Sequence, residues 1–476
     1  MLLYRFRWVF CQLDALQHSF PQNIRQYLNE LPDTLDDTYD RILKGINKAQ
    51  RDNAHRLLQC LTVAVRPLLV EELAELLAFD FQASTGGIPT LKEDWSWDDE
   101  EEAVLSICSS LITIIPRYGS RVVQFSHFSV KEYLTSPRLA RSPHGEVSRF
   151  RIDLEPAHTI MAQACLATLL RLDEHAGNGD PKVSPFVKYS AEHWVNHAQF
   201  EKVSLRLRDG MDDLFDSSKP QFAAWLRVHD MDECWYEFTP YSRDSVGSPL
   251  YYAASCGFYD LAERLITKDP EQVNALGGYN LFPLPAALYN RHFHVANLLY
   301  RHGAVVDVQG DDQCTPLYAA SSHGQVDIMR WLLNHGADVD VCYSGRYTPL
   351  CAAAYSIHLE AVQVLFDHHV DINSQDRTGW TSLYWILSRC GSKEKFVDMV
   401  RLLLELGADP NICDNDHSTP LHEASSRGLL EAARLLLSHG AKVDEKDGKG
   451  NTPFQLAASK ELTKLLVEYG AVPLSP

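Results

Sequence analysis

Apolar residues in the second half of the chain recur at helical spacing, in blocks that return about every 33 residues. Three such blocks carry Ile328, Trp331 and Leu332; Val362, Leu365 and Phe366; and Ala432, Leu435 and Leu436. A single block offers too small an apolar face to be buried alone, so neighbouring blocks must stack. The pattern predicts a solenoid of short amphipathic helices over residues 248–476.

Each block is marked at both ends. A Thr-Pro-Leu-like tripeptide opens it, starting at Ser248, Phe282, Thr315, Thr348, Thr381, Thr419 and Thr452. Proline is tolerated in the first turn of a helix, where its missing N–H would be unpaired anyway, so the tripeptide predicts a first short helix in every block. A glycine ends the second helix at residues 303, 336, 407, 440 and 470, where a left-handed cap is expected.

These marks resemble ankyrin repeats, which are stacked helix pairs joined by β-turn fingers. The resemblance implies about seven repeats that bind a protein partner through the finger tips and the concave face. The histidines before Gly303, Gly336 and Gly440, and His422, fall on repeat-defining positions and are expected to be scaffold.

Binding residues are expected where the repeat pattern does not dictate identity. Exposed Tyr, Trp and Arg supply much of the energy of protein interfaces. The candidates at the finger tips are Tyr343, Arg346, Tyr347, Arg377 and Trp380, and those on the first helices are Tyr252, Tyr289, Tyr355, Trp385, Arg389 and Arg427. At each position the alternative, an aromatic that only packs between repeats, has about equal weight.

Two irregularities interrupt the array. The block that starts at Thr381 is about five residues longer than the others, around 389–395, which predicts a longer loop between its two helices. The first block has no polar cap of its own, although solenoid ends generally need one. The preceding helical segment is a candidate to cover it.

The first half has a different pattern. Helical periodicity runs through residues 5–43, and further helices are expected at 55–64, 70–77 and 101–108. Two alternating segments at 111–115 and 121–126 then predict a β-hairpin, followed by a helix at 128–134. Three helices and a hairpin are the order of a winged-helix domain. The chain is therefore divided into a helical segment (1–47), a winged-helix domain (48–140), a mainly helical domain (150–245) and the repeats (248–476).

The acidic charge argues against nucleic acid as a partner. The formal net charge is −19, and it is spread over both halves. In DNA-binding winged helices the third helix enters the major groove. Here that helix contains no Lys or Arg and follows a run of carboxylates at 93–102, which would repel phosphate. A winged helix that packs against protein is the favoured interpretation.

Part of the first half resembles the region that follows the nucleotide-binding domain in fungal NACHT-ankyrin proteins, relatives of NOD-like receptors. The resemblance rests on residues 6–16, 31–43, 66–68, 71–73 and 125–134. It implies a winged helix that relays nucleotide state to the repeats. The chain has no Gly-x-x-x-x-Gly-Lys-Ser/Thr run, so nucleotide switching is not carried over. Met1 is expected to mark a truncated product, a misplaced start or an independent remnant.

No enzymatic, cofactor or metal site is expected. His193 and His197 have the four-residue spacing of metal ligands but lack the glutamate of a metalloprotease between them, so a surface or packing pair is favoured. Eleven scattered cysteines predict reduced thiols, and no signal peptide is evident, which favours the cytoplasm, with the nucleus as a further location. The sequence predicts a mostly α protein-interaction scaffold without membrane or small-molecule ligand; the alternative is a regulatory part of a signalling NTPase of the STAND type.

Overall fold

The structure is a computed structural model that describes residues 34–85, 87–92, 100–108, 110–117, 119–140, 145–173, 184–229, 231, 247–278, 282–309, 314–341, 343, 347–389 and 394–472. It divides into two compact units. The first runs to Pro249 and also takes in Cys256–Leu265; the second contains Leu250–Ser255 and everything from Ile266 onward. Most of the predicted segment at 1–47, the acidic run at 93–99, Arg346 and the inserted residues 390–393 lie outside the described residues.

The first unit begins with the predicted winged helix. Its helices are α3 (Leu35–Gly45), α4 (Arg51–Val63), α5 (Val70–Ala78), α6 (Glu100–Cys108) and α7 (Phe128–Thr135). An antiparallel sheet in the order β1-β5-β4 completes it, with β1 (Leu68–Leu69), β4 (Ile112–Arg117) and β5 (Ser120–Phe125). The helices and the β4–β5 hairpin confirm the predicted order. A second hairpin, β2 (Phe79–Thr85) with β3 (Ile88–Leu91), was not predicted.

A mainly helical segment follows in the same unit. Its elements are α8 (Pro137–Ala140), α9 (Gly145–Ser148), α10 (Leu154–Leu169), α11 (Val187–Ala198), α12 (Val203–Arg206), α13 (Arg208–Leu214) and α14 (Pro220–Val228). Its core is aromatic, because Trp194 lies edge-on to Trp225 with ring centroids 5.4 Å apart, and Phe215 lies 5.6 Å from Trp225. Both tryptophans are fully buried.

The same core continues into the first repeat. Phe258, which precedes α16 (Tyr259–Lys268), lies 5.4 Å from Trp194 between ring centroids. Gln199 donates to the Cys256 carbonyl at 2.7 Å, and Arg264 forms an ion pair with Asp212 at 2.6 Å. The first unit therefore includes most of α16, the second helix of the first repeat.

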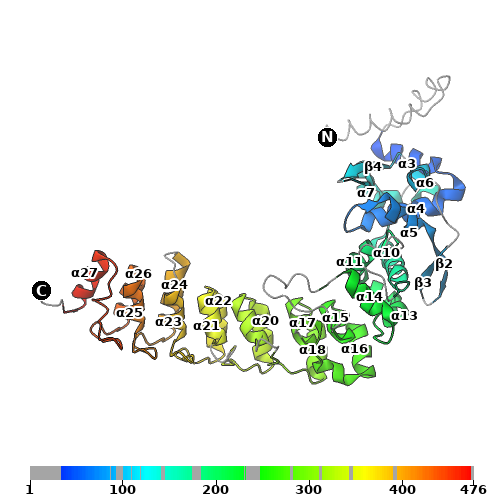
Figure 1. Ribbon diagram of the computed structural model, residues 1–476. Coiled ribbons are helices and arrows are strands. Elements are labelled where there is room, and N and C mark those ends of the chain that lie inside the picture. Colours follow the sequence, from blue (N-terminus) through cyan, green and yellow to red (C-terminus); the bar gives the residue numbers. More distant parts are fainter. Residues whose placement is uncertain are drawn as a thin grey trace. The chain divides into compact units, whose positions relative to one another are not determined.

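The second unit is a row of helix pairs, drawn side by side from green to red in Figure 1. The first helices are α15 (Pro249–Ser255), α17 (Pro283–Tyr289), α19 (Pro316–Ser322), α21 (Pro349–Tyr355), α23 (Ser382–Ser388) and α25 (Pro420–Ser426). After α16 the second helices are α18 (Phe293–Arg301), α20 (Val326–Asn334), α22 (Leu359–Asp367), α24 (Glu394–Glu405), α26 (Leu430–Ser438) and α27 (Lys460–Glu468).

The capping residues act as predicted. The Thr315 hydroxyl accepts from the Tyr318 amide at 3.2 Å, and Thr348 accepts from Cys351 in the same way. Gly336 has φ +89°, so it supplies the left-handed residue after α20. The histidines are scaffold: His335 binds the Trp331 carbonyl, and His422 binds Thr419 and the Asn451 carbonyl.

Two blocks differ from the prediction. The last one has no first helix, because only seven residues separate Thr452 from α27, and residues 453–456 form turns instead. In the long block, α24 has 12 residues where most second helices have nine, so the block differs in the length of this helix.

In several repeats an Asn or Asp side chain forms hydrogen bonds to the next repeat. Asn274 donates to the Gly303 carbonyl at 2.9 Å and accepts from the Val305 amide at 2.9 Å. Asn373 makes the same two bonds to its following repeat, with the Gly407 carbonyl and the Asp409 amide. Asn411 makes them with the Gly440 carbonyl and the Lys442 amide. We call this pair of bonds the repeat tie.

Candidate functional site

Trp385 on α23 is the centre of an aromatic cluster in the second unit. The rings of Tyr347, Tyr355 and Trp380 surround it with centroids 4.9, 6.0 and 4.6 Å away. All three meet Trp385 at steep interplanar angles, which is the favourable edge-to-face geometry. The sequence predicted all four residues as binding candidates, and the structure brings them together from three successive repeats.

Further aromatics extend the cluster along the fingers. Tyr343 and Tyr347 exchange two backbone hydrogen bonds, of 2.8 and 3.2 Å, which close one finger. The Tyr343 ring stacks on Tyr318 at 4.7 Å, and the Trp380 ring lies 4.8 Å from Tyr384. Burial raises the pKa of the Tyr318 and Tyr384 hydroxyls, so both stay protonated.

The sequence analysis missed Tyr318 and Tyr384. A signal for them exists, since each is the third residue after the threonine that opens its block, and Tyr251 stands at the same position of the first block.

Asp376 fixes the tryptophans at the centre of the cluster. Its Oδ1 atom accepts from the amides of Thr378 and Trp380 at 2.8 and 2.9 Å, and its Oδ2 atom accepts from Trp385 Nε1 at 3.0 Å. The carboxylate is only 9% exposed. Because the bond to Nε1 holds the Trp385 ring before any ligand arrives, ordering this ring on binding costs little conformational entropy.

Arg389 adds a cation to the cluster. Its guanidinium carbon lies 5.1 Å from the centroid of the Tyr355 ring, and the same group donates to the Tyr355 carbonyl. Tyr355 itself is 43% exposed. Among the described residues, no carboxylate is within ion-pair distance of Arg389. The cluster thus presents aromatic surface and a guanidinium group that retains unused donors.

The remaining candidates lie elsewhere in the chain. Tyr252 is only 6% exposed and packs edge-on against Tyr251, so its expected place on an exposed face is wrong. Tyr289 is half-buried at the end of α17, outside the cluster. Arg377 is exposed at a finger tip, and Arg427 is exposed but pairs with Glu423.

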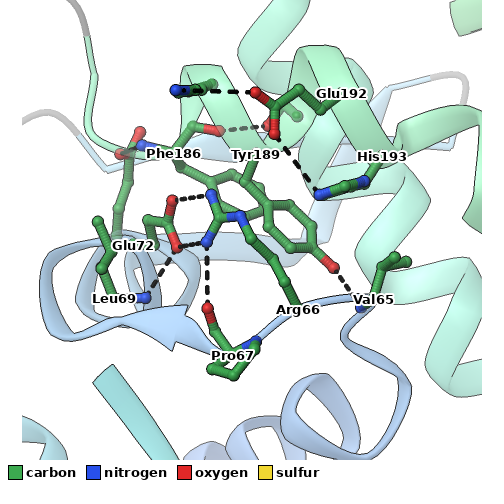
Figure 2. Close-up of polar contacts among 12 residues, drawn as sticks. Val65, Arg66, Pro67, Leu69, Glu72, Phe186, Tyr189, Glu192 and His193 are labelled. Carbon is green, nitrogen blue, oxygen red and sulfur yellow. Dashed lines mark hydrogen bonds and ion pairs between the residues drawn. The ribbon is translucent and has the colours of Figure 1, made fainter. Parts of the chain in front are cut away.

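A polar joint in the first unit connects the winged helix to α11. Figure 2 shows Arg66 lying between Glu72 and the ring of Tyr189. Arg66 donates two hydrogen bonds to Glu72, of 2.8 and 2.6 Å, and its guanidinium carbon lies 4.9 Å from the Tyr189 centroid. Glu72 also accepts from the Leu69 amide, and the Tyr189 hydroxyl accepts from the Val65 amide at 3.1 Å.

Histidines continue this joint into the interior. The Tyr189 hydroxyl is hydrogen-bonded to His197 Nε2 at 2.9 Å, and His197 Nδ1 lies 2.9 Å from His158 Nδ1. Burial, with His158 and His193 nearby, lowers the pKa of His197 to about 3, so its ring is neutral at ordinary pH. His193 packs edge-on to Tyr189, so the histidine pair has the predicted packing role.

The described residues contain no group of three or more His, Cys, Asp or Glu side chains placed to hold a metal ion. Burial raises the pKa of the Cys60 and Cys108 thiols to about 12, which leaves them unreactive. Within the described part of the chain no helix has the length and apolarity needed to span a bilayer.

Two family models match the chain. Ankyrin repeats match at residues 250–343, 284–376, 340–414 and 387–475. The winged helix domain of GPI inositol-deacylase matches at residues 39–144. The chain is thus mostly α, with a winged-helix domain and an ankyrin solenoid, and the repeats form a protein-interaction module.

Curated relatives and solved structures resemble parts of the chain. The azaphilone pigments biosynthesis cluster protein L of Monascus ruber is 32% identical over 316 residues, which are 62% of this chain and 65% of that protein. A putative ankyrin repeat protein of fowlpox virus is 40% identical over 53 residues, 11% of this chain and 6% of the viral protein. This chain therefore spans less than two thirds of either relative.

Among solved structures, the ankyrin repeat domain of Bcl-3, a member of the IkappaB protein family, is 26% identical. It covers 48% of this chain and all of its own, with a TM-score of 0.42. The human ASB11 ankyrin repeat domain is 28% identical, covers 48% of this chain and 99% of its own, and has a TM-score of 0.39.

Proposed function

We propose that this chain is a non-enzymatic scaffold or adaptor in a NACHT-type signalling context, and that its aromatic cluster binds a protein partner. The observation that carries the proposal is the cluster itself. Tyr347, Tyr355, Trp380 and Trp385 come from three repeats, and Asp376 accepts hydrogen bonds from the Trp380 amide and from Trp385 Nε1. A preorganised aromatic surface next to an arginine has the composition of an interface hot spot.

The experiment is a selection of binders from a displayed library of peptides and small domains against the purified chain. The selected binders are then tested on Tyr355→Ala and on a matched control, Tyr469→Ala. Tyr355 and Tyr469 are 43% and 44% exposed, but only Tyr355 belongs to the cluster. We expect Tyr355→Ala to weaken binding by about tenfold or more and Tyr469→Ala to leave it unchanged. Equal affinities for both variants would reject the cluster as the recognition surface.

A second function is a regulatory part of a STAND-type NTPase whose nucleotide-binding domain lies upstream or on another chain. The winged-helix match at residues 39–144 favours it. Reading the genomic sequence upstream of Met1 for an in-frame Gly-x-x-x-x-Gly-Lys-Ser/Thr tests the upstream form. The chain by itself is expected to bind no ATP, and stoichiometric binding measured by calorimetry would overturn this division of roles.

A further inference from the structure

The first helices of the repeats carry almost no negative charge. Across α15, α17, α19, α21, α23 and α25 the only carboxylate is that of Glu423, and it is ion-paired with Arg427. The second helices differ, since α24 alone contains Glu394, Asp398 and Glu405. In a chain with 63 acidic and 44 basic residues, the first helices thus carry less negative charge than the second helices. The carboxylate of Asp376, in the finger before α23, is buried and bonded to Trp385, so it does not face a ligand at the surface.

Arg389 is the cation best placed to receive an anion. The Tyr355 ring supports one face of the guanidinium, and the Tyr355 carbonyl accepts one of its donors. A guanidinium has five N–H donors in a planar fork, which fits a carboxylate through two parallel hydrogen bonds. Among the described residues, no carboxylate lies within ion-pair distance of this group.

We propose that the aromatic cluster and Arg389 bind an acidic segment of a partner protein. A Glu or Asp carboxylate of that segment is held by Arg389, and a neighbouring apolar side chain packs on Tyr355 and Trp385. This inference rests on the proposed function and specifies the partner's chemistry. A basic segment would bring its cations toward Arg389, with no free carboxylate on the first helices to compensate.

The test is a titration of the full chain with synthetic peptides, followed by tryptophan fluorescence, because Trp380 and Trp385 lie in the cluster. The probe peptide alternates glutamate with leucine and proline. Two matched peptides carry glutamine or lysine in place of each glutamate. We expect the glutamate peptide to bind about tenfold more tightly than the glutamine peptide, a ratio that corresponds to ~1.4 kcal/mol. Added salt should reduce the preference.

Variants assign the preference to its residue. Arg389→Gln should remove the difference between the glutamate and glutamine peptides, and Arg389→Lys should restore part of it, because lysine keeps the charge but not the fork. The control is Arg434→Gln, an exposed arginine on α26 that should leave the preference intact. Thermal melting of each variant shows whether the fold is retained.

The outcomes separate this inference from the proposed function. Three results would overturn the acidic partner and leave a neutral or basic protein partner in place. They are equal binding of the glutamate and glutamine peptides, tighter binding of the lysine peptide, and a glutamate preference that survives in Arg389→Gln. If no peptide binds, and the library selection yields no binder that Tyr355→Ala weakens, both the acidic partner and the proposed function are rejected. Preferential binding of single-stranded DNA over the glutamate peptide would reject a protein segment as the anion.

Discussion

The repeat tie contains a defect whose repair should stabilise the second unit. Asp307 stands at the tie position, and its Oδ2 atom accepts from the Asp338 amide at 2.9 Å as the Asn residues do. Its Oδ1 atom occupies the place of the amide nitrogen that donates to a glycine carbonyl in the other ties. That oxygen is buried and has no hydrogen-bond partner among the described residues. Burial and the charge of Asp338 both raise the pKa of Asp307.

Replacing Asp307 by Asn should restore the missing bond, to the Gly336 carbonyl. The gain combines one added hydrogen bond, about 0.5–1.5 kcal/mol, with relief of a buried unsatisfied oxygen, about 1–3 kcal/mol. Because the site is only partly buried, we expect the lower part of that range, about 1.5–2 kcal/mol at neutral pH. For a unit of this size the melting temperature should rise by roughly 3–8 °C.

The pH dependence gives an independent check. The raised pKa means that the folded chain binds a proton at Asp307 more readily than the unfolded chain does. Stability contributed by this group is therefore present below the ordinary aspartate pKa and is lost as the pH rises through the raised value. Below that window the protonated carboxyl can itself donate, so the advantage of Asp307→Asn should shrink in acid.

The assay is thermal and urea unfolding of both proteins at neutral and acid pH, with Asn411→Asp as the reverse substitution. Asn411→Asp should lose about what Asp307→Asn gains, because it removes the donor to the Gly440 carbonyl. The proposed defect at Asp307 would be refuted if Asp307→Asn did not raise the free energy of unfolding. It would also be refuted if the increase were the same at neutral and acid pH.

Three further changes test other contacts. Glu72→Ala should cost about 3–5 kcal/mol, because it leaves Arg66 and the Leu69 amide without their carboxylate; urea unfolding measures it, with the half-exposed Glu71→Ala as control. Because the folded pKa of His197 is about 3, stability should fall by ~4 kcal/mol as the pH drops from 6.5 toward that value, and His197→Phe should show a shallower acid slope in urea titrations. Gly379→Ala should destabilise more than Gly336→Ala in thermal melts: both have positive φ, but only at 379 would a Cβ atom lie 2.8 Å from the Asn415 amide.

Local chemistry explains why the repeats could be predicted from sequence. Thr315 and Gly336 act on their own helices, so the hydrogen bond and the positive φ that they supply are readable from the chain alone. Burial of a single aromatic is different, because it depends on the helix face that a neighbour covers. Tyr251 and Tyr252 are adjacent, and nothing in the repeat period indicates that both would be buried.

The polar joint could not be predicted because its partners are distant in sequence. In the sequence, Arg66 and Tyr189 are separated by both β-hairpins and by α10. Neither residue belongs to a periodic pattern. The histidine spacing on α11 was visible, but the partner that explains it, His158, comes from α10. Only the packing of α10 on α11 turns two histidines of unknown role into a buried network.

Helix α11 connects the two ends of the first unit. The Tyr189 hydroxyl accepts a hydrogen bond from the Val65 amide, and the Tyr189 ring lies against the Arg66 guanidinium. Just before the helix, the Phe186 amide donates to Glu75 of α5 at 3.1 Å. Five residues after Tyr189 on the same helix, Trp194 packs on Phe258, which precedes α16. An α-helix of 12 residues is a stiff rod about 18 Å long. A displacement of the winged helix that keeps these contacts must therefore carry α11, and α16 with it.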